Sequence, residues 1–232
     1  RYASLDHLTE GRVGFNVVTS YLPSAAENQG LPTQIPHDER YEIADEFLDV
    51  CYKLWEGSWE DGAVIKDRER GIYADPSKVH PIGHKGKYFS VPGISLTEPS
   101  PQRTPVIFQA GASSRGQQFS GKHAEAVFIS ALRPDLTRVV TDRIRAAAEE
   151  QGRSRDDVKI LAMLSVIVDE TEEKAKAKYE DYKKYINLDS AQAIIGGWSG
   201  VDPITSQKPH LPILLHWGLS FNINLGGDKN VQ

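Results

Sequence analysis

The sequence has almost no cysteine: Cys51 is the single one among 232 residues. An internal disulfide is therefore excluded, and the apolar pattern around Cys51 predicts a buried thiol within a helix. Because chains without disulfides are typical of reducing compartments, we expect a cytoplasmic protein. The single methionine is internal and the sequence begins with Arg1. We therefore expect the chain to start part-way through a longer polypeptide, or after processing.

Long apolar runs and basic clusters are also missing. No segment approaches the roughly 18 consecutive apolar residues that a membrane-spanning helix needs, so we expect no membrane as partner. The formal net charge is −5, and no run of Lys or Arg dominates a segment. This argues against a surface that tracks nucleic-acid phosphates. The hydrophobic share of 39% and the charged share of 25% are typical of a globular domain.

What the sequence does contain is an alternation of apolar strands with amphipathic helices. We expect strands at 13–18, 105–109, 126–129 and 158–168, and helices at 38–55, 114–123, 136–151 and 170–186. Buried, non-alternating apolar strands joined by helices predict an α/β fold with a parallel sheet and helical crossovers. The periodicity fits a closed barrel and an open doubly wound sheet equally well.

Three stretches depart from this alternation. Residues 19–37 are rich in Pro, Ser, Gly and Asn and are expected to form a long loop. Residues 57–105 are dense in Gly, Pro, Asp and Lys, which predicts an inserted excursion with small hairpins. Residues 203–232 fit no strand–helix unit.

Two of the candidate binding segments flank the predicted loop. Asn16, Thr19 and Ser20 stand at the carboxyl end of the first strand, where parallel α/β folds bind ligands. His37 and Tyr41 are four residues apart and share one face of a helix amino terminus, which favours an anion or a polar ring edge. The alternatives are a simple turn for the first segment and a solvated helix start for the second.

The third candidate, residues 109–116, joins a strand to a helix. Its small residues let backbone N–H groups approach a ligand, and Ser113 and Ser114 stand where a phosphate would meet the helix amino terminus. A plain serine cap is an equal alternative. His80 and His84 are four residues apart, but no carboxylate pattern accompanies them, so we expect no metal site.

Read together, these segments resemble one family, the two-component, reduced-FMN-dependent monooxygenases of the bacterial-luciferase-like superfamily. This is the class of nitrilotriacetate monooxygenase component A and dibenzothiophene-sulfone monooxygenase. The resemblance runs from residue 1 to about 202 and rests on the stretches ASLDHLTEGR, GFNVVTS, HDERYEIADEF, LWEGSW, YADPSKVHPIGHKGKYF and PVIFQAGASSRG. It implies a TIM-barrel-like fold that carries the insertion at about 57–105.

The resemblance also implies a cofactor and its contacts. FMN would arrive reduced from a separate NAD(P)H-dependent flavin reductase. It would react with O2 to a C4a-peroxide that inserts one oxygen atom into a small organic substrate. Catalytic residues and the substrate are not implied. The flavin contacts carried over by position are Asn16, Thr19, Ser20, His37, Tyr41, Ser113 and Ser114.

The resemblance implies a parent chain roughly twice as long as this one. We therefore expect an incomplete barrel over 1–202, and a divergent or non-native tail over 203–232 of the kind that an incorrect gene model produces. An open barrel exposes two strand edges and an apolar interior face, so we expect the chain alone to be inactive. A non-catalytic flavin- or phosphate-binding remnant and a partner that completes a split barrel remain alternatives, and homo-oligomerisation stays open.

Overall fold

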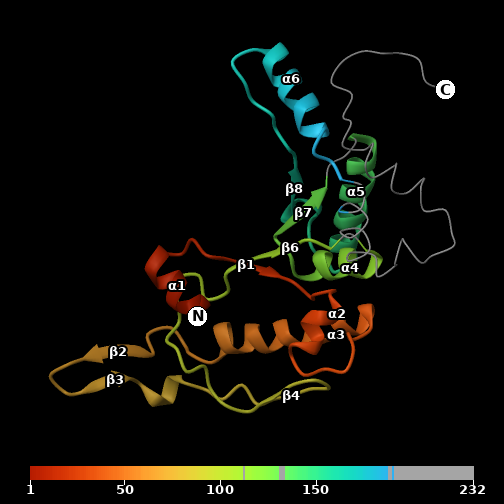
Figure 1. Ribbon diagram of the computed structural model, residues 1–232. Coiled ribbons are helices and arrows are strands. Elements are labelled where there is room, and N and C mark those ends of the chain that lie inside the picture. Colours follow the sequence, from red (N-terminus) through yellow and green to blue (C-terminus); the bar gives the residue numbers. More distant parts are fainter. Residues whose placement is uncertain (112, 131–133, 188–189, 191–232) are drawn as a thin grey trace. The chain divides into compact units, whose positions relative to one another are not determined.

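A computed structural model describes residues 1–111, 113–130, 134–187 and 190 (Figure 1). The tail at 203–232 lies outside the described residues. The elements in chain order are α1 (Tyr2–Thr9), β1 (Gly14–Val17), α2 (Pro23–Glu27), α3 (His37–Tyr52), the π-turn Lys53–Gly57, β2 (Val64–Asp67), β3 (Ile72–Ala74), the 3-10 turn Pro76–Lys78, β4 (His84–Lys85), β5 (Ser90–Val91), β6 (Val106–Gln109), α4 (Ser114–His123), β7 (Ala126–Ser130), α5 (Pro134–Glu150), the 3-10 turn Arg155–Asp157, β8 (Lys159–Met163) and α6 (Glu172–Lys183).

The chain divides into two compact units. The first comprises Arg1–Thr19, Ile35–Phe128 and Asp142–Leu161, and the second comprises the remaining segments. Among the described residues, the second unit holds the helices α2 and α6 and the first part of α5, up to Thr141. All of the predicted flavin contacts except Ser20 fall in the first unit, which therefore carries the candidate site.

The predicted parallel sheet is present. Its four strands follow the order β1-β6-β7-β8. β1 pairs in parallel with β6, which sets Asn16 beside Phe108 and Val17 beside Gln109, and β6 pairs in parallel with β7. Because parallel strands end at one edge of the sheet, the residues that follow β1 and β6 are neighbours there. Among the described residues, β1 and β8 each have a strand neighbour on one side only.

The strands alternate between two faces, contrary to the expectation of continuous burial. In β6, Ile107 and Gln109 are buried, whereas Phe108 turns to the other face and stacks on Phe128 of β7 with ring centroids 5.5 Å apart. The difference arises because α3 and α4 cover one face. The core on that face consists of Val17, Tyr41, Ala44, Leu48, Ile107 and Phe119.

Two predicted elements differ in extent. The strand expected over 158–168 ends at Met163, and the side chains of Leu164, Val166 and Val168 are exposed. Their apolar character predicted that they pair with a neighbouring strand, but the described sheet ends before them. The loop expected over 19–37 contains α2, which begins at Pro23 as helices often do but is too short to show a helical period.

Helix α3 is the longest element next to the site. Asp38 and Glu39 in its first turn favour the helix amino terminus, as predicted. Cys51 is buried, as its apolar surroundings predicted, and burial raises the pKa of its thiol to about 12. The thiol is therefore a packing group and not a nucleophile at neutral pH.

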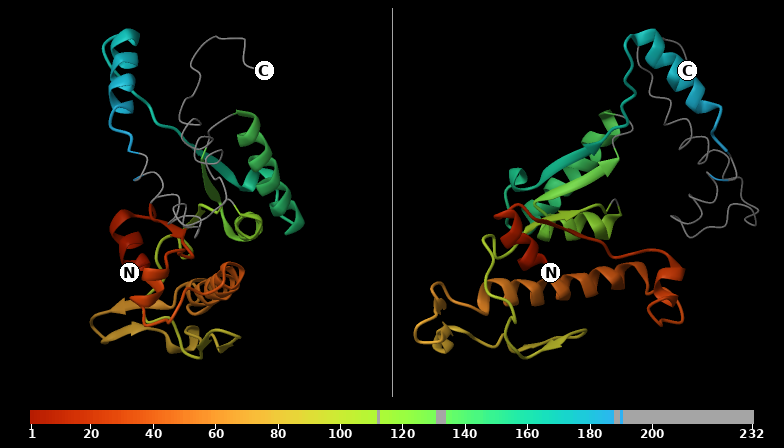
Figure 2. Two further views of the ribbon diagram at one scale, coloured as in Figure 1. Left: turned by 45° about the vertical axis from the view of Figure 1, so that its right-hand side comes forward. Right: turned by 60° about the vertical axis from the view of Figure 1, so that its left-hand side comes forward.

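The insertion forms two antiparallel pairs, β2 with β3 and β4 with β5, as predicted. The segment that contains β4 runs beside α3, whereas the β2–β3 hairpin extends beyond the end of that helix (Figures 1 and 2). Glu46 of α3 anchors the insertion to the helix. Its carboxylate accepts the N–H groups of Tyr88 at 2.9 Å and Phe89 at 2.8 Å. It also lies 3.1 Å from His84 Nε2, and Lys53 Nζ lies 2.9 Å from the Nδ1 of the same ring.

The Glu46 contacts predict an acid-sensitive attachment. Burial opposes ionisation, but the N–H groups of Tyr88 and Phe89 and the ring of His84 outweigh it and lower the pKa of Glu46 from 4.5 to about 2. A depressed folded-state pKa contributes stability that is present above the ordinary pKa and is lost as the pH falls through the folded value. We expect the urea midpoint to fall between pH 4.5 and 2, and Glu46→Gln to be less stable at pH 7 with a flatter profile over that range.

Glu60→Gln is the matched control, because Glu60 pairs with His80 on the exposed surface, where ion pairs contribute little. It should retain the pH profile of the unmodified chain. If Glu46→Gln retained that profile as well, the insertion would not be fastened through this carboxylate.

Helices α4 and α5 approach each other closely at Gly121. A Cβ atom there would lie 2.5 Å from the carbonyl carbon of Ala147 and 2.7 Å from its Cβ. We expect Gly121→Ala to lower the free energy of unfolding by about 1–3 kcal/mol, because overpacking outweighs a gain of roughly 1 kcal/mol in helix propensity. Gly57→Ala, where nothing lies within 4 Å, should be neutral or stabilising in the same urea titration. Equal midpoints for the two variants would show that the helices separate without cost.

Candidate functional site

The candidate site is built around the start of α4. Ser113 is its N-cap, and the Ser113 hydroxyl accepts the N–H of Gly116 at 3.0 Å. Tyr41 of α3 is buried, and its hydroxyl lies against the same turn. A Cβ atom on Gly116 would lie 2.7 Å from Tyr41 Oη, and one on Gly111 would lie 2.8 Å from it. Only glycine at both positions lets the Tyr41 hydroxyl reach the helix start.

Gln109, whose role the sequence did not reveal, supports this turn from the end of the sheet strand β6. It is the last residue of β6, and its side chain is buried. The carboxamide oxygen accepts the N–H of Gly111 in a short hydrogen bond and lies 2.7 Å from the Ser120 hydroxyl. A polar residue that ends an otherwise apolar strand was the available clue, because a buried amide requires partners.

His37 and Tyr41 share one face of α3, as predicted. Their ring centroids lie 5.2 Å apart at an interplanar angle of 63°. The His37 side chain is 48% exposed, and its Nδ1 lies 2.6 Å from a carboxylate oxygen of Asp38. The histidine therefore forms an accessible rim beside the buried tyrosine. Ser114, the first residue of α4, is also exposed.

The strand-end residues are placed differently. Asn16 is exposed and alternates with Val17, which packs with Tyr41 in the core. Asn16 therefore lies near the same carboxyl edge of the sheet as Ser113, but on the face opposite Tyr41. Thr19 follows β1 and is half-buried. Ser20 is the first residue of the second unit and adopts a left-handed backbone conformation with φ 61°.

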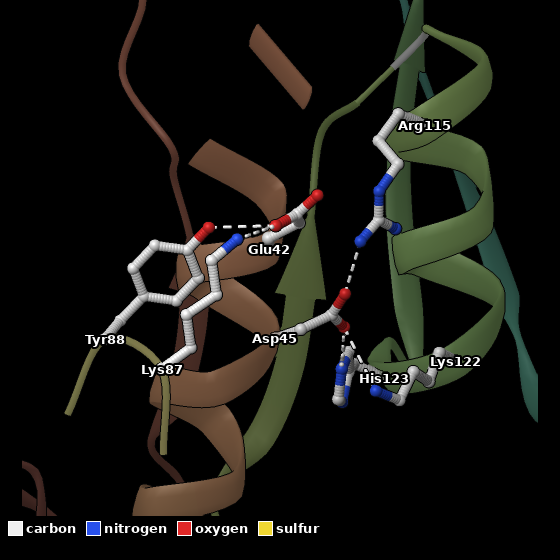
Figure 3. Close-up of polar contacts among 7 residues, drawn as sticks. All are labelled: Glu42, Asp45, Lys87, Tyr88, Arg115, Lys122 and His123. Carbon is white, nitrogen blue, oxygen red and sulfur yellow. Dashed lines mark hydrogen bonds and ion pairs between the residues drawn. The ribbon is translucent and has the colours of Figure 1, made fainter. Parts of the chain in front are cut away.

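Asp45 dominates the electrostatics beside α4 (Figure 3). Its carboxylate accepts a short hydrogen bond from Arg115, lies 2.7 Å from His123 Nε2 and pairs with Lys122 at 3.2 Å. Burial opposes its ionisation, but the contacts with His123 and Arg115 outweigh burial and hold the pKa of Asp45 well below its usual range. The charge of Asp45 is therefore matched by three cationic or polar donors.

The two histidines of the insertion have separate partners. His80 Nε2 lies 2.6 Å from a carboxylate oxygen of Glu60, and His84 contacts Glu46 and Lys53. The sequence around the two histidines contains no pattern of carboxylates, because Glu60 and Glu46 are distant from their partners along the chain. None of the helices in the described ranges is both long and apolar enough to cross a membrane.

The chemistry available at the start of α4 is that of an anion site. Ser113, Ser114 and Tyr41 contribute hydroxyls, and the first turn of a ten-residue helix contributes N–H groups and the positive end of its dipole. Phosphate esters prefer this donor set. The nearby carboxylate of Asp45 is engaged by its own partners and presents little opposing charge.

Comparison with known proteins gives consistent matches. The family model described as luciferase-like monooxygenase matches residues 1–203. The dimethyl-sulfide monooxygenase of Hyphomicrobium sulfonivorans is 55% identical over 202 residues, which cover 87% of this chain and 42% of that protein. A crystal structure of a long-chain alkane monooxygenase matches with a TM-score of 0.84 at 53% identity, covering 88% of this chain and 47% of the other.

A third match carries a flavin. The crystal structure of a riboflavin lyase, solved with modified FMN and the substrate riboflavin, has a TM-score of 0.83 at 42% identity. It covers 89% of this chain and 46% of the lyase chain. The chain thus spans less than half the length of each of these three proteins. The resemblance inferred from its motifs is confirmed, and its parallel sheet is part of a TIM-barrel-like fold. On this agreement of sequence and fold, the chain belongs to the luciferase-like monooxygenase family.

Proposed function

We propose that this chain is the FMN-phosphate-binding part of a monooxygenase that inserts one atom of O2 into a small organic substrate. The observation that carries the proposal is the meeting of the Tyr41 hydroxyl and the Ser113 cap at the glycine turn that begins α4. Two relatives are named as monooxygenases of dimethyl sulfide and of long-chain alkanes, and the riboflavin lyase structure contains a modified FMN.

The residues present fit a phosphate monoester. Ser113, Ser114 and Tyr41 would hold the phosphate, because their hydroxyls lie at the start of α4, where the positive end of the helix dipole favours an anion. His37 would close the rim beside it. Asn16, with Thr19 and Ser20, would contact the remainder of the flavin from the end of β1.

Reduced FMN, when bound, supplies the electrons that activate O2. The task of this chain is to orient the cofactor and to exclude water. Tyr41 is suited to both, because its ring is buried in the core while its hydroxyl reaches the helix start. A separate NAD(P)H-dependent flavin reductase would deliver the cofactor in its reduced state. A cytoplasmic location agrees with the single cysteine.

We propose further that the chain on its own does not turn over. Among the described strands, β1 and β8 leave an edge unpaired, and the sheet face that bears Phe108 and Phe128 has half-exposed rings. An open sheet of this kind admits water and lacks the residues that the rest of a barrel supplies. The same edges favour a second candidate, a flavin-binding partner that completes a split barrel.

The phosphate site predicts discrimination between FMN and riboflavin. We expect the chain to bind FMN, and Ser113→Ala to weaken FMN binding about tenfold, the loss expected for a hydrogen bond to a charged group. Riboflavin, which has no phosphate, should bind the variant and the unmodified chain alike. Titration monitored by flavin fluorescence measures both affinities.

Ser154→Ala is the matched control. Ser154 also caps a helical turn, accepting the N–H of Asp156, but it precedes β8 and so lies toward the opposite edge of the sheet. Its FMN affinity should equal that of the unmodified chain. A chain that binds no FMN would contradict the proposal. Monooxygenation of dimethyl sulfide or an alkane by the chain with a flavin reductase would contradict the inactivity that we propose for it alone.

A further inference from the structure

Asp45 connects α3 to both ends of α4. On α3 it stands one turn after Tyr41, on the same face. Its partners on α4 are Arg115 in the first turn and Lys122 and His123 in the last (Figure 3). A single carboxylate thus contacts both ends of a ten-residue helix, because the long Arg115 side chain reaches along it.

The contact with His123 has a defined direction. Tyr52 Oη lies 3.1 Å from His123 Nδ1, and burial raises the pKa of Tyr52 to about 12. The ionised carboxylate of Asp45 can only accept, so the Nε2–H of His123 donates to it at 2.7 Å, and the Tyr52 hydroxyl is the hydrogen-bond partner of Nδ1. The His123 side chain is 3% exposed. This leg of the connection is therefore shielded from solvent and from competing water.

The position of α4 along α3 determines the geometry at its start. The Tyr41 hydroxyl meets Gly111 and Gly116 at distances that leave no room for a Cβ atom. The guanidinium of Arg115 also lies 5.8 Å from the centre of the Tyr41 ring. If α4 slid or rotated against α3, the hydroxyls of Tyr41 and Ser113 would separate. The Asp45 contacts oppose both movements.

We propose that Asp45 is a positioning residue for the phosphate site, holding α4 against α3 so that the Tyr41 and Ser113 hydroxyls converge on one anion. This inference rests on the proposed function and deepens it. Asp45 does not touch the phosphate; it acts through Arg115 and His123. It also occupies the guanidinium of Arg115, which would otherwise be free to move toward the anion.

The test compares two carboxylates of α3 that differ in their contacts. Asp45→Asn removes the charge and one of the two acceptor oxygens that connect α3 to α4. Glu42→Gln removes a charge one turn earlier, where the partners are Lys87 at 3.0 Å and Tyr88 at 2.8 Å, both in the insertion (Figure 3). Hydrogen bonds from Lys87 and Tyr88, with a smaller contribution from the charge of Arg115, lower the pKa of Glu42. Each variant removes one negative charge from α3, but Asp45 contacts the Arg115 guanidinium directly and Glu42 influences it only weakly from a distance. Only Asp45→Asn therefore weakens the hold of α3 on α4.

We expect Asp45→Asn to weaken FMN binding about tenfold and Glu42→Gln to leave it within twofold. In a Ser113→Ala background the cost of Asp45→Asn should shrink to less than twofold, because the site that Asp45 positions is already impaired. His123→Phe, which breaks the connection at the far end of α4 while keeping a ring there, should weaken FMN binding in the same direction. His123→Phe keeps the inference testable if Asp45→Asn fails to fold.

Other outcomes would overturn the inference. Tighter FMN binding by Asp45→Asn would make Arg115 a direct phosphate ligand that Asp45 restrains. An equal loss in both backgrounds would make Asp45 a structural residue independent of the site. An equal loss of FMN affinity in Glu42→Gln would show that removing a negative charge from α3, and not breaking the contact with α4, weakens binding. If the unmodified chain binds no FMN, it is the proposed function that fails, which the first titration reveals before any variant is made.

Discussion

The packing of α3 across the start of α4 is the constraint on which the rest of the site depends. Tyr41 reaches the helix start only because Gly111 and Gly116 leave space for its hydroxyl. Gln109 holds the turn from the sheet, and Asp45 holds the helix from the side. The proposed anion site is therefore a product of tertiary packing, and the N-cap serine would supply only one of its donors.

The two faces of the sheet differ in the residues that they carry. The face of the sheet covered by α3 and α4 contains the core and the polar residues that fix α4. The other face bears Asn16, Phe108 and Phe128, which the described residues leave partly exposed. In a closed barrel this second face would be the interior. A flavin whose phosphate lies at α4 and whose ring lies toward Asn16 would use the common edge of both faces, and a barrel left open would expose that ring to water.

Local sequence patterns predicted the local features well. The start of α4 follows from the serines Ser113 and Ser114, and the His37–Tyr41 ring contact follows from a separation of one helical turn. The parallel sheet follows from strands alternating with helices. The local patterns alone left open whether residues 109–116 form an anion site or a plain serine cap. The family resemblance added the expectation that the ligand is FMN.

The features that were missed depend on distant partners. Asp45 lies 78 residues from His123, and Glu46 lies 38 residues from His84. No spacing rule links such pairs, so the sequence alone pointed to no role for either carboxylate. The alternation of burial in β6 was missed for a related reason, because it depends on which face the helices cover and not on the composition of the strand.

The central claim is that the hydroxyls of Tyr41 and Ser113 surround a single flavin phosphate. A crystal structure of the chain soaked with FMN tests this most directly. The account predicts the phosphate at the start of α4, within hydrogen-bonding distance of both hydroxyls, with the flavin ring extending toward the end of β1. A phosphate bound elsewhere, with the start of α4 left to water, would contradict it.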